Sequence, residues 1–332
     1  MHPLMIPELY APFPARIHAH VVAINEATAS WVIRFHLHEG VAFARYQREG
    51  LSWMTARFYP EAAPERLAIA DKINTLLFAV DDLMDHNDHK SEVISSRDRF
   101  IAFTDLCLRI MQGETVVLPS TGHLAALADV WAQAVSVSTS AWQRSFTGAI
   151  RQMFDAALWA YDNVAAGRWP SAAEYYRMRP FLGAANTSTD MIEFCDGIKL
   201  PQDLQYHPVI AELTRLCQIT VCLANDLFSL SKEMAHEDQH NMVVILKNEQ
   251  GASLSRAIRQ TVKMHNADVK TFIGLLSQLP EAGEHAQELR RYITSLTALM
   301  RGNIDWSVNE TSRYSFRYQA RRTHKRKRWA ER

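Results

Sequence analysis

Two clusters of oxygen-bearing side chains, far apart in the chain, are the residues best suited to do chemistry. The first is the run DDLMD, in which Asp81, Asp82 and Asp85 follow an apolar helical segment. Asp81 and Asp85 lie four residues apart and share one helix face with Leu77, so these carboxylates continue an apolar stripe. Carboxylates near a helix C-terminus are costly, because the helix dipole disfavours negative charge there. A hard cation such as Mg²⁺ would offset that cost, and a solvated acidic helix end is the alternative.

The second cluster is the run NDLFSLSKE at residues 225–233. Its Asn225, Ser229 and Glu233 are spaced by four, so an amide, a hydroxyl and a carboxylate oxygen line one face of a helix. Such a set can chelate one hard cation, and Lys232 beside it can contact an anion that the cation also binds. An ordinary polar helix end is the alternative. Together, the two clusters predict a divalent-metal site.

A third feature is a predicted break in a helix within residues 175–193. Pro180 cannot continue a helix without the loss of a hydrogen bond, and Gly183 permits unusual backbone angles. A broken helix would expose backbone carbonyls and amides to whatever fills a neighbouring pocket. A proline-kinked surface helix is the alternative.

The two oxygen-rich clusters, together with an Arg-Tyr pair near the C-terminus, resemble the three signatures of the bacterial class I terpene synthases (terpene cyclases) in their order and separation. The signatures are the aspartate-rich motif at Asp81–Asp85, the NSE metal triad at Asn225–Glu233, and a C-terminal Arg-Tyr pair at Arg313 and Tyr314. The resemblance covers about residues 12–318. It implies an all-α fold, a single class I terpenoid synthase-like helical bundle around a deep apolar pocket, with the metal motifs facing each other across its mouth. It also implies three Mg²⁺ ions, a linear prenyl diphosphate substrate, and the metal ligands Asp81, Asp82, Asp85, Asn225, Ser229 and Glu233.

The resemblance also assigns roles within the predicted helix break. The family carries a diphosphate-sensing arginine there, followed three residues later by a linker and then by an effector glycine. Arg179, Leu182 and Gly183 match this spacing. Leu182 departs from the family pattern, in which the linker is commonly polar. Arg177, in the same turn, is the competing candidate for the contact with diphosphate.

Ionisation of an allylic diphosphate produces an anion and a carbocation, and each needs its own partners. Divalent cations and hydrogen-bond donors stabilise the departing diphosphate, whereas a dry pocket with aromatic faces stabilises the carbocation. For each aromatic residue, ordinary core packing is the alternative. The predicted catalytic residues are Asp81, Arg179, Gly183, Arg313 and Tyr314; the predicted substrate-binding residues are Arg179, Lys232, Arg313, Tyr314, Phe78 and Trp306, with Trp53 and Trp159 as further candidates to line the pocket.

Long amphipathic helices are the elements expected to position these residues. Gly and Pro are few, with 12 of each, and no convincing run of alternating strand residues appears. We expect one all-α domain over residues 1–316, with a proline-rich lead-in at 1–14, and a basic tail at 317–332. One predicted helix carries the stripe Ile73, Leu76, Leu77, Val80, Leu83 and Met84, and further helices are predicted at 19–37, 97–112, 123–165, 253–279 and 285–303.

The charge of the chain is balanced in total but not in distribution. There are 36 basic and 36 acidic residues, which argues against nucleic-acid binding by bulk electrostatics. Residues 317–332 carry eight basic residues and one acid, a net +7, which leaves −7 for the body. The acids needed to collect Mg²⁺ explain part of that negative body.

Location and partners are predicted from what the chain lacks. Its four cysteines are scattered without a CxxC pair, and it has neither a signal-like start nor an apolar run of membrane-spanning length. We therefore expect a cytoplasmic protein with no stable membrane insertion and no nucleic-acid partner. The expected partner is a prenyl diphosphate, and a homodimer is considered.

Residues 236–240 read HEDQH, a literal match to the H-E-x-x-H motif of zinc proteases. That motif would place His236 and His240 on one helix face, with Glu237 as general base. The match begins three residues after Glu233 and resembles the loop that follows the family's metal helix. We therefore expect no zinc protease.

Two other hypotheses remain beside a cyclase. A prenyl-chain elongating synthase would share the substrate and fold, but it normally carries two aspartate-rich motifs and this chain has one. A non-catalytic protein could bind phosphate or lipid through the basic segment 321–329, for which a solvated terminus is the plainer interpretation.

The preferred hypothesis is a Mg²⁺-dependent class I cyclase that converts farnesyl diphosphate to a sesquiterpene and releases diphosphate. A diterpene cyclase that uses geranylgeranyl diphosphate is the main alternative, and geranyl diphosphate is the third substrate. The volume of the pocket decides among the three. The product skeleton, and whether water is captured, depend on how the pocket folds the chain.

Overall fold

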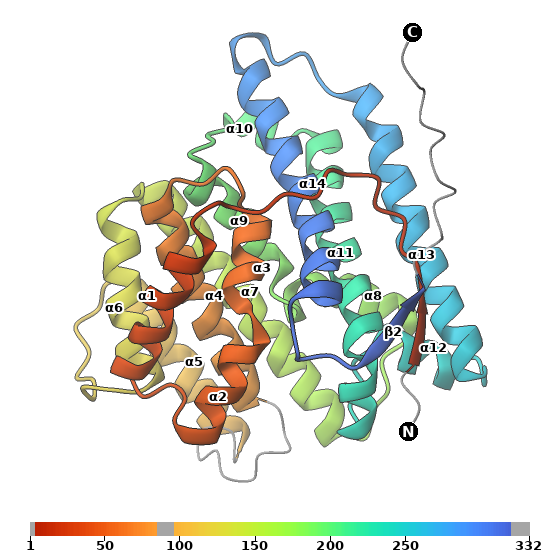
Figure 1. Ribbon diagram of the computed structural model, residues 1–332, viewed down its shortest axis with the longest axis horizontal. Coiled ribbons are helices and arrows are strands. Elements are labelled where there is room, and N and C mark those ends of the chain that lie inside the picture. Colours follow the sequence, from red (N-terminus) through yellow and green to blue (C-terminus); the bar gives the residue numbers. More distant parts are fainter. Residues whose placement is uncertain (1–3, 85–95, 320–332) are drawn as a thin grey trace, which may run out of the picture.

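Helices make up most of the chain that the structure describes. The computed structural model describes residues 4–84 and 96–319 (Figure 1). The all-α class expected from the sequence is confirmed, and none of the described helices is both long and apolar enough to cross a membrane. The elements are β1 (Leu4–Pro7), α1 (Val21–Arg34), α2 (Gly40–Glu49), α3 (Leu51–Phe58), α4 (Pro64–Met84), α5 (Arg97–Met111), α6 (His123–Ser136), α7 (Ser140–Ala165), α8 (Ala172–Leu182), α9 (Ala185–Asp196), α10 (Gln202–Gln205), α11 (Pro208–Ala235), α12 (Met242–Glu249), α13 (Leu254–Leu275), the short 3₁₀ helices η2 (Leu276–Gln278) and η3 (Gly283–His285), α14 (Ala286–Asn309) and β2 (Phe316–Gln319).

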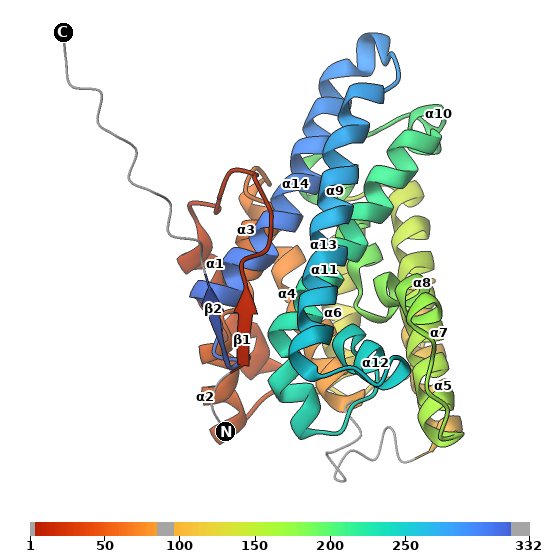
Figure 2. The same cartoon turned by 90° about the vertical axis from the view of Figure 1, so that its right-hand side faces the viewer.

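The long helix α11 connects two parts of the apolar core. Its first half contributes Leu213 and Cys217 to a cluster that includes residues of α1, α3, α4, α6 and α7. Its second half contributes Leu223 and Leu227 to a cluster shared with α8, α12 and α13. α11 packs closely against α13 and α14 (Figures 1 and 2). The helix that carries the predicted metal triad is therefore fixed by burial along most of its length.

One helix predicted from the sequence is two helices in the structure. The segment 123–165 was expected to be continuous, but α6 ends at Ser136 and α7 begins at Ser140. Thr139 caps the start of α7, because its hydroxyl accepts a hydrogen bond from the backbone N–H of Trp142. The apolar period continues across this junction, so periodicity alone did not mark it. The other predicted helices are present, with shifted ends.

A short parallel sheet is the second departure from the expected all-helical pattern. β1 pairs with β2 in a register that aligns Leu4 with Phe316, and both views show the strands side by side (Figures 1 and 2). Ile6 of β1 is fully buried, and the ring of Phe228 from α11 stacks on Phe316 at a centroid distance of 4.8 Å. Each strand has only four residues, too few for an alternating pattern to stand out in the sequence.

Strand β2 runs across the position predicted to separate the domain from the tail, residue 316. Residues 317–319, expected to begin the basic tail, belong to β2. Pairing with the distant β1 supplies their backbone hydrogen bonds, and no local sequence signal reports that pairing. The rest of the predicted tail, 320–332, lies outside the described residues.

α14 packs against α3 at a point where only glycine fits. A Cβ atom on Gly302 would lie 2.9 Å from the carbonyl oxygen of Arg57 and 3.0 Å from its carbonyl carbon. Ionic contacts beside this point tie the same two helices, because Arg57 donates from Nε to Glu310 at 2.7 Å and pairs with Asp305 at 3.5 Å. α14 also carries Trp306, so this close approach sets the position of one predicted site residue.

We predict that Gly302→Ala lowers the free energy of unfolding by about 1–3 kcal/mol, because the added methyl group would overlap backbone atoms of α3. Gly148→Ala, inside α7, is the matched control, since a Cβ there meets no atom within 4 Å. That control is expected to gain up to about 1 kcal/mol from helix propensity. Urea unfolding followed by circular dichroism measures both, and equal stabilities for the two variants would contradict the close packing.

Candidate active site at the mouth of a cavity

The helices enclose a cavity of about 390 Å³ that is lined by both apolar and charged side chains. Its apolar lining includes Met54, Phe58, Leu77, Met153 and Val221. Most of the predicted site residues also line it, namely Phe78, Asp81, Arg179, Gly183, Asn225, Ser229, Lys232, Glu233, Trp306, Arg313 and Tyr314. The end that holds the charged residues opens to solvent, because Asp81 is exposed. This end is called the cavity mouth below.

One predicted metal ligand falls outside the described residues, and another has its own set of partners. Asp85 lies outside the described residues, and Asp82 does not line the cavity among the residues the structure describes. Both oxygens of Asp82 accept from Arg313, with Nη2–Oδ1 at 2.5 Å and Nη1–Oδ2 at 3.3 Å. Burial opposes the charge of Asp82, but Arg313, Lys232 and Arg45 together hold the pKa of this carboxyl below its ordinary value. In this structure the carboxylate of Asp82 pairs with Arg313 and Lys232, and its role as a metal ligand stays a prediction.

Arg313 has a second carboxylate partner, Glu49, that the sequence analysis missed. Nη1 of Arg313 donates to Oε2 of Glu49 at 2.9 Å, and the two side chains are only 6% and 7% exposed. Burial opposes the charge of Arg313, yet Asp82 and Glu49 raise its pKa above the ordinary value, so it stays protonated. The neighbouring Gly50 accepts a hydrogen bond from the indole of Trp306 at 2.7 Å. No local pattern marks Glu49, since its partner lies 264 positions away.

Arg179 is held at the mouth by a buried ion pair. Its Nε donates to Oδ1 of Asp226 at 2.7 Å, with side-chain exposures of 8% and 0%. Its Nη2 donates to Oδ1 of Asn225 at 2.8 Å. Burial opposes its charge, but the carboxylate of Asp226 raises the pKa of Arg179 well above its ordinary value. Arg177, the competing candidate, is exposed on the same helix, so the geometry favours Arg179.

Asp226 is the second functional residue that sequence reasoning missed. It lies within the predicted triad motif but faces away from the row of Asn225. Its carboxylate also accepts from the backbone N–H of Met242 at 2.9 Å and the hydroxyl of Tyr175 at 3.3 Å. A charged residue inside a mostly apolar helix stretch was the available signal, because such a residue needs a buried partner.

The predicted helix break is present, although it does not fall at the proline. α8 continues through Pro180 and ends at Leu182, and Ala184 then adopts a left-handed conformation with φ of 53° before α9 begins. A Cβ on Gly183 would lie 2.3 Å from Nη1 of Arg179 and 3.0 Å from Sγ of Cys222. Gly183 therefore leaves the room that the Arg179 guanidinium occupies.

The three residues of the predicted triad keep free oxygen lone pairs. Asn225 uses one lone pair of its amide oxygen for Arg179 and donates from Nδ2 to the hydroxyl of Tyr314 at 2.9 Å. Ser229 donates to the carbonyl of Asn225 at 2.8 Å, which leaves its own oxygen able to accept. Glu233 receives one hydrogen bond from Asn241 on Oε2 at 2.5 Å. This donor set, all oxygen, suits a hard divalent cation.

Two further observations bear on metal binding at this position. Burial, with the charges of Asp226 and Asp238, raises the pKa of Glu233 to about 8. A cation beside it would favour the charged form. Within residues 4–84 and 96–319, no group of three His, Cys, Asp or Glu side chains is arranged to bind a metal. A site here would therefore depend on the amide and hydroxyl oxygens of Asn225 and Ser229.

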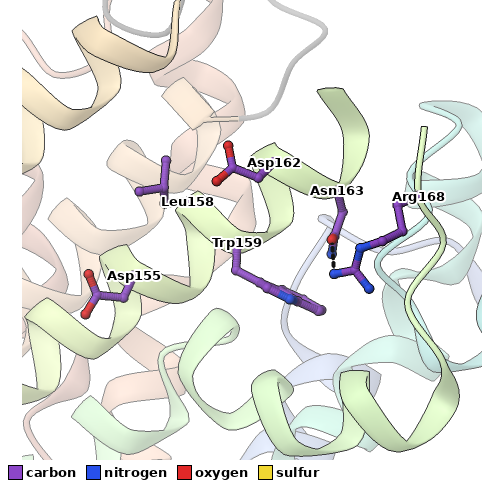
Figure 3. Close-up of a pocket in the computed structure, with 6 residues that line it drawn as sticks. All are labelled: Asp155, Leu158, Trp159, Asp162, Asn163 and Arg168. Atoms are coloured by element: carbon purple, nitrogen blue, oxygen red, sulfur yellow. Dashed lines mark hydrogen bonds between the residues drawn. The ribbon is translucent and has the colours of Figure 1, made fainter. Parts of the chain in front are cut away.

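Aromatic residues line one part of the cavity. The rings of Phe78 and Trp306 meet edge to face at 6.2 Å, and Trp306 meets Tyr314 in the same way at 5.7 Å. The other two candidate liners are placed elsewhere: neither Trp53 nor Trp159 belongs to the described lining of this cavity. Trp159 instead lines a separate hollow on the outer side of α7, where the Arg168 guanidinium lies 6.0 Å from its ring centroid (Figure 3).

The HEDQH segment does not form a zinc-protease helix. α11 ends at Ala235, and Glu237 has a left-handed φ of 57°, so His236 and His240 do not share a helix face. His240 is buried and contacts Asn163 at 3.3 Å. The segment lines the cavity mouth as a loop, which agrees with the expectation from its position after Glu233.

Comparisons with known proteins agree with this architecture. Residues 72–271 match the family model "Terpene synthase family 2, C-terminal metal binding". The chain is 30% identical to a (+)-T-muurolol synthase ((2E,6E)-farnesyl diphosphate cyclizing) of Roseiflexus castenholzii, over 91% of this chain and 92% of that protein. It is 28% identical to a germacrene A synthase of Nostoc punctiforme, over 95% and 96%. The crystal structure of a linalool/nerolidol synthase from Streptomyces clavuligerus matches in fold with a TM-score of 0.79 at 22% identity, over 90% and 100% of the two chains.

We predict that Asp226→Asn lowers the free energy of unfolding by about 3–5 kcal/mol, because it leaves the buried Arg179 guanidinium without a counter-charge. Asp162→Asn is the control: Asp162 pairs with Arg97 at 2.8 Å, but both side chains are about half exposed. Solvent screens that pair, so its loss should leave stability unchanged. Urea denaturation of both variants measures the difference, and a stable Asp226→Asn protein would show that the buried pair is not required.

Proposed function

The chain belongs to the bacterial terpene synthase family as a class I terpene cyclase, and we propose that it is a Mg²⁺-dependent enzyme that cyclises farnesyl diphosphate to a sesquiterpene. One observation carries the proposal. At the mouth of an apolar cavity, the cations Arg179, Lys232 and Arg313 come together with oxygen donors that suit Mg²⁺. A diphosphate placed there would have its hydrocarbon chain inside the cavity.

The proposed metal ligands lie on α4 and α11. Asp81, at the end of α4, has a side chain that is 56% exposed and lies 3.9 Å from Nη2 of Arg313, and Asp85 would extend the same row. Asn225, Ser229 and Glu233 would hold metal on α11. The family resemblance implies three Mg²⁺ ions, which would neutralise the diphosphate as its bond to carbon breaks.

The proposed diphosphate donors are Arg179, Lys232, Arg313 and Tyr314. Arg313 and Lys232 contact Asp82 in this structure, at 2.5 and 3.9 Å. Both would turn toward an arriving diphosphate, which offers more negative charge than one carboxylate. The hydroxyl of Tyr314 accepts from Asn225, so its own hydrogen remains available to donate to a diphosphate oxygen.

In the proposed reaction, the bond between the allylic carbon and the diphosphate oxygen breaks, and the diphosphate leaves with the electron pair. A π bond of the same chain then attacks the carbocation and closes a ring, and transfer of a proton to the departed diphosphate would yield a neutral hydrocarbon. The faces of Phe78 and Trp306 would stabilise positive charge in the cavity. Its apolar walls would exclude water until the last step.

The choice of farnesyl diphosphate rests on size and on similarity. A cavity of about 390 Å³ lies at the lower end of the usual range for ligand pockets, which favours the shorter chains over geranylgeranyl diphosphate. The muurolol synthase that matches 91% of this chain is described as cyclising farnesyl diphosphate. Geranylgeranyl and geranyl diphosphate remain the alternative substrates for the assay below.

The test is incubation of the full chain with geranyl, farnesyl and geranylgeranyl diphosphate and Mg²⁺, followed by gas chromatography and mass spectrometry. Cyclic sesquiterpenes from farnesyl diphosphate are expected. Only linear alcohols, or no product, from all three substrates would contradict a cyclase. Longer prenyl diphosphates, formed when isopentenyl diphosphate is added, would indicate a chain-elongating synthase instead.

We predict that Asp81→Ala and Asn225→Ala each lower kcat by about 100-fold or more, because each removes an oxygen proposed to hold metal against the diphosphate. Asp162→Asn serves as the folded control with unchanged turnover. Release of diphosphate from farnesyl diphosphate is the measurement, with and without chelator. Full activity in either variant, with the fold intact by circular dichroism, would refute the metal assignment.

A further inference from the structure

A second, smaller cavity lies behind the wall of the proposed substrate cavity. Its volume is about 40 Å³, and it is enclosed by α4, α5, α6 and α7. Its walls include Ile73, Leu76 and Val80 of α4 and Phe154 of α7. Nearly all of the other side chains around it are apolar as well. A space of this kind stays dry and can accept hydrocarbon without displacing bound water.

Two faces of α4 line the two cavities. Asn74, Leu77, Phe78 and Asp81 line the substrate cavity, and Ile73, Leu76, Leu77 and Val80 line the smaller one. Each set follows the spacing i, i+3, i+4, i+7, which is one face of a helix. Leu77 is the residue that the two sets share.

The opposite wall, on α7, is divided in a similar way but without a shared residue. Met153 lines the substrate cavity, and the adjacent Phe154 lines the smaller one. Both of these side chains are 5% exposed. The one side chain described as facing both spaces is therefore Leu77, which is half-buried and has space on either side.

We propose that Leu77 closes the substrate cavity against the smaller cavity and thereby selects farnesyl over geranylgeranyl diphosphate. This inference rests on the proposed function. Removal of the Leu77 side chain would join the two spaces and add an apolar lobe to the substrate cavity.

The place of Leu77 along α4 suits this role. It lies one helical turn before Asp81, where the proposed metal site would hold the diphosphate. Ring closure brings the far end of a prenyl chain back toward the carbon that has lost its diphosphate. The end of a folded chain therefore returns to the level of Leu77, and an additional isoprene unit would need apolar space at that level.

The experiment compares Leu77→Ala with Leu76→Ala. Leu76 is the matched control, because it is the same residue type on the same helix, is 5% exposed, and lines only the smaller cavity. Farnesyl and geranylgeranyl diphosphate compete in one vessel, and the ratio of the two kcat/KM values is measured from the products. Calorimetric binding of the unreactive thiolo analogues of both substrates provides a measure that does not depend on turnover.

For Leu77→Ala we expect the ratio of geranylgeranyl to farnesyl kcat/KM to rise by about tenfold or more, because even one methylene group in an apolar pocket is typically discriminated at that level. The ratio of analogue affinities should shift in the same direction, and Leu76→Ala should leave both ratios unchanged. If Leu77→Ala does not fold, Leu77→Val should produce a smaller shift of the same sign.

Two results would overturn the inference: unchanged ratios in folded Leu77 variants, or an equal shift in Leu76→Ala, which would indicate general loosening of the helices. The failure of the proposed function looks different. In that case the wild-type chain turns over neither substrate, and the analogue affinities still decide whether Leu77 limits chain length.

Discussion

Burial of two guanidinium groups beside an apolar cavity is the constraint on which the site depends. Arg179 and Arg313 are 8% and 6% exposed and stay charged, so each needs a carboxylate within hydrogen-bond distance to offset the cost of burying its charge. Asp226 accepts a hydrogen bond from Arg179, and Asp82 and Glu49 accept hydrogen bonds from Arg313. To bring these groups together, α2, α4, α8, α11 and the segment after α14 must all converge at the cavity mouth.

This constraint changes the interpretation of the acidic body of the chain. Part of its −7 charge was predicted to come from acids that collect metal, and Asp81 and Glu233 suit that role. Asp82, Glu49 and Asp226 instead neutralise arginines in the structure. The arginines at the mouth therefore have their counter-charges within the protein itself. When a diphosphate binds with its cations, the arginines would exchange carboxylate partners for phosphate oxygens, and the carboxylates would exchange arginines for metal ions. Because each charge keeps an opposite charge beside it, the electrostatic cost of binding is limited.

The parts of the fold and site that were predictable are those with local signals. Spacing by four placed Asn225 and its two partners on one face, and the apolar period located α13 and α14. What escaped prediction depends on contacts between distant segments. Glu49 has meaning only beside Arg313, and the four-residue β1 exists only because β2 pairs with it. The junction at 137–139 was not predicted because a local signal was misleading: the apolar period continues through it.

α4 shows why a correct helix prediction can still conceal a second functional face. The apolar stripe predicted through Leu76 and Val80 is real, but it faces the small cavity between α4, α5, α6 and α7. The face toward the substrate cavity carries Asn74 and Asp81, and these polar groups break the apolar period that would have revealed it. When a helix is buried on two sides, the apolar periodicity of its sequence identifies only the more apolar of the two buried faces. Leu77 lies where the two faces meet, so its contact with both cavities could be recognised only once the neighbouring helices were in place.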